Sequence, residues 1–97
     1  MMTSKQRAYL RGLAQKIETI LTVGKAGVIP TLTKQCDDAL TKRELIKGQA
    51  LENSPLTARE AAEELAELTQ SEVVQVIGRR FTLYRPNPEK PQIVLPK

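Results

Sequence analysis

The hydrophobic positions at the start of the chain follow first a helical and then an extended spacing. Four apolar residues recur at intervals of three and four positions: Leu10, Leu13, Ala14 and Ile17. This spacing places them on one face of a helix over about residues 5–16, for which Ser4 is the expected N-cap. The β-branched and apolar run over residues 19–23, which ends at Gly24, predicts a strand.

The rest of the chain continues this alternation of helical and extended patterns. A second helix is predicted from Pro30 to about residue 42, because the missing N–H of proline costs little in the first helical turn. Thr57 and Glu60 have the spacing of a capping box, which predicts a third helix that continues to about residue 69. The remaining apolar runs predict three more strands, over residues 44–51, 72–77 and 81–85.

The order of the predicted elements is α-β-α-β-α-β-β, which defines an α/β fold. Strands that alternate with helices are joined by right-handed parallel crossovers, whereas the tight final hairpin makes the last strand antiparallel. We therefore expect a small mixed four-stranded sheet with three helices, forming a single domain over residues 1–86. Four of the six prolines lie from Pro86 onward, so residues 87–97 are expected to form an extended proline-rich tail.

The composition of the 97 residues indicates a folded domain with an aliphatic core. The chain has one Phe, two Tyr and no Trp, and no apolar run is long enough to span a membrane. It shows no signal-peptide pattern at its start. Its single cysteine, Cys36, falls on the apolar side of the second predicted helix, which favours a reduced, buried and inert thiol. These features predict a cytoplasmic protein.

The positive charge is concentrated in the first half of the chain. The net charge is +4; residues 1–47 carry nine Lys/Arg against four Asp/Glu, and residues 48–97 carry six against seven. A basic half-domain favours an anionic partner, with nucleic acid ahead of an acidic protein or a membrane surface.

The motif Gly24-Lys25-Ala26-Gly27 lies between the first predicted strand and the second predicted helix. Glycine tolerates positive φ and close backbone approach, while a helix N-terminus and a lysine both attract anions. These are the properties of a phosphate-binding loop. They are also those of an ordinary strand-to-helix turn, so the motif by itself leaves both interpretations open.

Three longer segments together resemble the CRM domain, the RNA-binding module named for chloroplast RNA splicing and ribosome maturation. They are SKQRAYLRGLAQKIETILTVGKAGV, RELIKGQALEN and EAAEELAELTQSEVVQVIGRRFTLYRP, and the resemblance covers about residues 3–86. It implies a fold similar to the C-terminal domain of bacterial translation initiation factor three. It also implies binding of ribosomal RNA in precursor large subunits, through the GxxG loop and neighbouring basic residues.

The residues predicted to bind RNA combine this loop with basic side chains elsewhere in the chain. They are Gly24, Lys25, Ala26, Gly27, Lys5, Arg7, Arg11, Lys47, Arg79 and Arg80. Where members of the family often have a second basic or β-branched residue, this chain has Gly48-Gln49, so Lys47 is the contribution expected from that strand. Because aromatic residues are few, we expect a structured or double-stranded RNA rather than a stacked single strand.

Other functional classes fit the sequence less well. A KH loop joins two helices, and a P-loop needs a longer spacing and a Gly-Lys-Ser/Thr ending. The absence of histidine excludes the common nucleophile–base pairs, and the carboxylates of the third helix lack the His partners of a metal site. We therefore expect a monomeric protein that is not an enzyme and uses no cofactor or metal. The alternative is a protein-interaction adaptor on the ribosome, acting through the acidic third helix or the tail.

Overall fold

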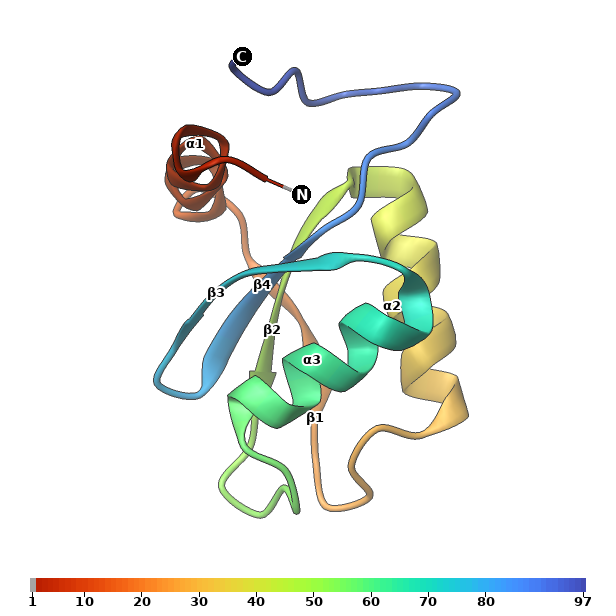
Figure 1. Ribbon diagram of the computed structural model, residues 1–97. Helices are drawn as coiled ribbons and strands as arrows, with labels where there is room; N and C mark the ends of the chain where they lie inside the picture. Colours follow the sequence, from red (N-terminus) through yellow and green to blue (C-terminus); the bar gives the residue numbers. More distant parts are fainter. Residues whose placement is uncertain (1) are drawn as a thin grey trace.

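The computed structural model describes residues 2–97 and contains the seven predicted elements in the predicted order (Figure 1). The helices and strands are α1 (Ser4–Ala14), β1 (Thr19–Val23), α2 (Pro30–Arg43), β2 (Leu45–Ala50), α3 (Ala58–Thr69), β3 (Glu72–Ile77) and β4 (Arg80–Tyr84). The predicted α/β class, with three helices and four strands, is therefore confirmed.

The four strands form one mixed sheet in the order β1-β2-β4-β3. β1 pairs in parallel with β2, while β4 lies between β2 and β3 and is antiparallel to both. The chain therefore leaves β1 and β2 at the same end of the sheet at which the β3–β4 hairpin turns. Figure 1 shows the β1–α2 and β2–α3 connections at the bottom of the molecule and the turn of the β3–β4 hairpin at its lower left.

The sheet is covered by helices on both faces, which separates two hydrophobic clusters. α2 and α3 pack on one face over the larger cluster, which includes Leu21, Cys36, Ile46, Leu65 and Phe81. α1 packs on the other face over a smaller cluster of Leu10, Ala14, Leu45, Val74 and Tyr84. Burial of these apolar side chains is the main stabilising contribution, and the shorter α1 leaves part of its face of the sheet uncovered.

The ends of the helices follow local sequence signals, with one correction. The Thr57 hydroxyl accepts a hydrogen bond from the Glu60 N–H at 3.1 Å, and the Glu60 carboxylate accepts one from the Thr57 N–H at 2.9 Å, so the predicted capping box is confirmed. The prediction of Ser4 as the N-cap of α1 is wrong. Thr3 is the N-cap, because Gln6 completes a capping box with it.

The segment after β4 contains no helix or strand and is attached to the body through Glu44. This residue directly follows α2, has a positive φ of 63°, and is 0% exposed. Its carboxylate accepts hydrogen bonds from the N–H groups of Asn87, Gln92 and Ile93, at 2.6, 2.7 and 2.8 Å. Ile93 and Leu95 then pack against the α1 cluster. The buried carboxylate thus anchors the start of the tail, together with hydrogen bonds from the Asn87 and Gln92 side-chain amides to the carbonyls of Thr41 and Lys42.

Candidate nucleic-acid interface

The GxxG loop (residues 24–27) forms a tight turn between β1 and α2. The Gly27 N–H donates to the Gly24 carbonyl at 3.0 Å, and Gly27 has a positive φ of 73°. Gly27 is buried, and a Cβ on it would lie 3.3 Å from Cγ of Pro55. The close approach that requires glycine here is therefore to Pro55. In addition, α2 begins only at Pro30, with Ile29 as its N-cap, so the loop precedes the helix N-terminus instead of forming it.

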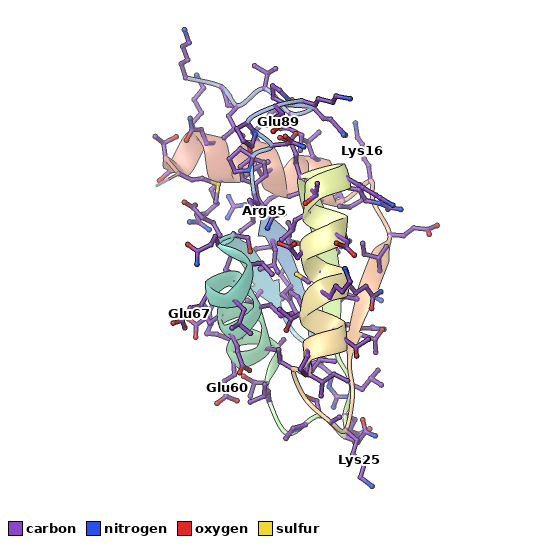
Figure 2. The ribbon with its side chains drawn as sticks, turned by 90° about the vertical axis from the view of Figure 1, so that its right-hand side faces the viewer. Lys16, Lys25, Glu60, Glu67, Arg85 and Glu89 are labelled. Atoms are coloured by element: carbon purple, nitrogen blue, oxygen red, sulfur yellow. The ribbon has the colours of Figure 1, made fainter. Side chains whose placement is uncertain are left out.

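Lys25 and Ala26 form the exposed tip of this turn. Figure 2 shows the Lys25 side chain at the lower extremity of the molecule, directed away from the body. Among residues 2–97, neither the Lys25 side chain nor the backbone N–H groups of Lys25 and Ala26 donate a hydrogen bond. The tip therefore presents one full positive charge and two free backbone donors, which suits an anionic oxygen.

The β3–β4 hairpin brings two more cations to the same end of the sheet. Its two-residue turn consists of Gly78, with a φ of 58°, and Arg79. The Arg79 carbonyl accepts from the Ala50 N–H at 2.8 Å, which ties the turn to the end of β2. The Arg79 guanidinium lies 3.9 Å from the Glu52 carboxylate in an exposed pair, a geometry worth little in water. Arg80 is exposed and makes no ion pair among the described residues.

Lys47 lies on the face of the sheet that carries α1, beyond the end of that helix. Its ammonium donates to the Ile17 carbonyl at 3.4 Å, a long hydrogen bond that leaves other protons available. Lys47 lines a groove of about 240 Å³ with residues from α1, β3 and β4. We call this the sheet groove; its lining residues are Ala14, Gln15, Lys47, Gln75, Ile77, Arg80 and Thr82.

The three basic residues of α1 have different environments, which the sequence did not distinguish. The half-buried Arg7 donates from Nη1 to the carbonyls of Val73 and Val74, at 2.6 and 2.8 Å, and thus ties α1 to the edge strand β3. Lys5 lies near the end of the tail, where its ammonium donates to the Lys97 carbonyl at 3.4 Å. Arg11 is exposed and lies one helical turn before Gln15, on the side that borders the sheet groove.

The structure therefore brings together part of the predicted set and adds polar residues that were not predicted. Lys25, Lys47, Arg79 and Arg80 belong to the loop end and the open part of the sheet, whereas Arg7 and Lys5 contact β3 and the tail. The added residues are Gln15, Gln75 and Thr82. Gln75 and Thr82 are uncharged strand residues without a sequence signal for a site, and only the pairing of β2, β4 and β3 brings them beside Lys47. Gln15 is the C-cap of α1 and reaches the groove because α1 packs on this face of the sheet.

The opposite face of the molecule carries the acidic charge. Glu60, Glu63, Glu64 and Glu67 are all exposed on α3, and Figure 2 shows Glu60 and Glu67 on its outer side. Within residues 2–97, no three His, Cys, Asp or Glu side chains are grouped so that they could hold a metal ion. In the same range, no helix has the length and apolar character needed to cross a membrane.

Cys36 is buried under α3 and has no disulfide partner, as its position on the apolar face of α2 predicted. Burial raises the pKa of its thiol to about 11. The thiol therefore stays protonated at neutral pH, where it packs as a small apolar group.

Comparison with known proteins identifies the family. The family model of the CRS1/YhbY (CRM) domain matches residues 2–85. This chain belongs to the CRM domain family, as its three characteristic segments predicted.

Two relatives and one solved structure match the chain over nearly their full length. The Bacillus subtilis (strain 168) protein named "Probable RNA-binding protein YqeI" is 41% identical over 96 residues, covering 99% of this chain and 100% of that protein. A Haemophilus influenzae protein named "RNA-binding protein" is 29% identical, covering 99% of this chain and 96% of its own. The solution structure of SAV1595 from Staphylococcus aureus is 47% identical, with a TM-score of 0.81, and covers 99% of this chain and 100% of its own.

Proposed function

We propose that this protein binds structured RNA through a basic surface that extends from the loop end of the sheet onto the face that carries α1. The surface consists of the exposed tip of the GxxG loop, Lys47, Arg79 and Arg80. One observation supports this most directly: the parallel β1–β2 pair and the β3–β4 hairpin direct three connections to one end, so cations distant in sequence lie on one side. The names of the relatives, which refer to RNA binding, favour the same function.

Phosphate contacts supply most of the affinity in this proposal. Lys25 and the free N–H groups beside it bind one phosphate, and the arginines of the hairpin bind the backbone farther along. The family resemblance points to ribosomal RNA within precursor large subunits as the target. We further propose that the protein acts as a monomer in the cytoplasm. Residues 1–86 form the binding unit, and the tail 87–97 supports α1.

The salt dependence of binding tests this mechanism. If about four phosphates are neutralised, log K against log salt concentration has a slope of roughly −3 to −4. Electrophoretic mobility of ribosomal RNA fragments at several salt concentrations measures this slope. A slope near zero contradicts the proposal.

The competing function is that of a protein-interaction adaptor on the ribosome. Because the acidic helix and the basic surface lie on different faces, substitutions can test the two functions separately. The exposed carboxylates of α3 lie on the face of the sheet opposite to α1. The variant Glu64→Ala, on the acidic side, leaves RNA affinity unchanged or slightly higher if the basic surface binds RNA. If substitutions on α3 abolish association with ribosomal particles while Lys25→Ala has no effect, the adaptor function is correct.

A further inference from the structure

The sheet groove has a regular polar floor that follows from strand register. Lys47 in β2 pairs with Thr82 in β4, and Thr82 pairs with Gln75 in β3, so these three residues form one row across the sheet. Directly paired residues share a face, with their Cβ atoms about 5 Å apart. The next row toward the loop end contains Gln49, Arg80 and Ile77. The hydrogen-bonding side chains of Thr82 and Gln75 therefore lie next to the positively charged Lys47.

Two of the three polar side chains in this row, those of Thr82 and Gln75, have no hydrogen-bond partner among residues 2–97. Thr82 is only 2% exposed, yet its hydroxyl makes no hydrogen bond to any residue in the range 2–97. The side-chain amide of Gln75 likewise makes none among these residues. By contrast, the hydroxyl of the buried Thr69 donates to the Leu65 carbonyl at 2.6 Å. Among the described residues no buried side-chain polar atom lacks a partner, so the Thr82 hydroxyl, which has none, is accessible from the groove that it lines and is available to a ligand there.

The chemistry of the groove selects the kind of ligand. A glutamine amide and a threonine hydroxyl each both donate and accept, and the Lys47 ammonium donates, which matches the mixed edge of a nucleobase. Ile77 is 67% exposed and offers apolar contact beside Arg80, whose planar guanidinium can stack on a base. The volume of about 240 Å³ is below the ~300 Å³ at which pockets for drug-sized ligands begin, so the groove suits a single base.

We propose that the sheet groove binds one unpaired RNA base, read by Gln75, Thr82 and Lys47. This inference rests on the proposed RNA binding and specifies its substrate: a helix interrupted by an unpaired nucleotide, not a continuous duplex. Arg79 and Arg80 of the β3–β4 hairpin and Lys25 of the GxxG loop bind the RNA backbone on either side of the flipped base. A paired base cannot enter, because its reading edge is already engaged with its partner.

The test compares two RNA hairpins that differ only by one unpaired nucleotide in the stem. The parent protein is expected to bind the interrupted hairpin about tenfold more tightly than the fully paired one. Gln75→Ala and Thr82→Val should each reduce this preference at least threefold and leave the salt slope unchanged, because both side chains are neutral. The matched control is Gln35→Ala, an exposed glutamine on α2, which should retain the full preference.

A second measurement reports on the base itself. With 2-aminopurine at the unpaired position, binding of the parent protein should change its fluorescence, and Gln75→Ala should abolish most of that change. Gln75 is half-buried in the edge strand of the sheet, so we expect Gln75→Ala to fold. This variant therefore tests the proposal even if Thr82→Val fails to fold. Equal binding of both hairpins with a normal salt slope overturns the base site and leaves the proposed function intact. Failure to bind either hairpin overturns both.

Discussion

Gly48 in β2 and Phe81 in β4 are paired across the sheet, and the ring of Phe81 occupies the space that a side chain on Gly48 would need. A Cβ on Gly48 would lie 2.4 Å from Cζ and 2.6 Å from Cε1 of the ring. Phe81 is 1% exposed and is the only phenylalanine of the chain. The glycine in the middle of this strand is therefore a packing requirement of the core.

The first prediction concerns this pair. Gly48→Val should lower the free energy of unfolding by about 1–3 kcal/mol or more, because the valine and the ring cannot occupy the same space. Urea denaturation measures the loss. In the double variant with Phe81→Leu, the smaller residue makes room, so the two substitutions together should cost less than the sum of their separate effects. A Gly48→Val variant as stable as the parent contradicts this interpretation.

The second prediction concerns the tip of the GxxG loop. Lys25→Ala should weaken RNA binding and reduce the salt slope by about one unit, since one phosphate contact is lost. Its effect on stability should stay within about 0.5 kcal/mol, because the exposed side chain has no partner among the described residues. Mobility shifts at several salt concentrations and thermal melts measure the two effects.

Two further variants serve as comparisons for Lys25→Ala. Lys34→Ala removes another exposed lysine, from α2 on the other face of the sheet, and should leave RNA affinity nearly unchanged. Gly27→Val should lower both stability and affinity, because a β-branched residue resists a φ of 73° and would press on Pro55. If Lys25→Ala and Lys34→Ala weaken binding equally, the loop tip has no special role.

The third prediction separates two arginines of α1. Arg7→Ala should lower the free energy of unfolding by about 1–3 kcal/mol, because two hydrogen bonds from its guanidinium to carbonyls of β3 are lost. Arg11→Ala should affect stability little and RNA binding more, since Arg11 is exposed beside the sheet groove. Denaturation and mobility shifts on the two variants check both statements. The reverse ranking would show that Arg7 faces the RNA.

The fourth prediction concerns pH and the tail. Burial by itself raises the pKa of Glu44, but hydrogen bonds from the N–H groups of Asn87, Gln92 and Ile93 outweigh it and hold the pKa below its usual 4.5. A lowered pKa stabilises the fold fully above that usual value, and the contribution is lost as the pH falls through the folded-state pKa. Glu44→Gln should therefore cost about 1–3 kcal/mol at neutral pH and progressively less below pH 4.5.

Urea denaturation across a pH series, with amide exchange at Gln92 and Ile93, measures the effect of Glu44→Gln. The control is Glu89→Gln, which changes an exposed carboxylate of the tail and should leave both readouts close to those of the parent. A constant difference between Glu44→Gln and the parent at every pH would show that the ionised carboxylate is not what holds the tail.

The sequence by itself determined the elements and their order. Helical and extended spacings, the Thr57–Glu60 capping box and Gly24 at the end of a strand are local signals, and local signals depend only on neighbours along the chain. The same is true of the position of Cys36 on an apolar helix face. The family could be inferred as well, because its characteristic segments are continuous stretches of sequence.

Only the tertiary structure decided which of these elements meet. No local pattern places β4 between β2 and β3, and this placement sets Lys47, Thr82 and Gln75 in one row. Arg7 and Glu44 are charged residues that the sequence alone assigns to solvent or to the start of a strand. Their partners lie on β3 and in the tail, more than 40 positions away along the chain. Such contacts depend on strand order and burial, which arise when the whole chain packs and not from any single segment.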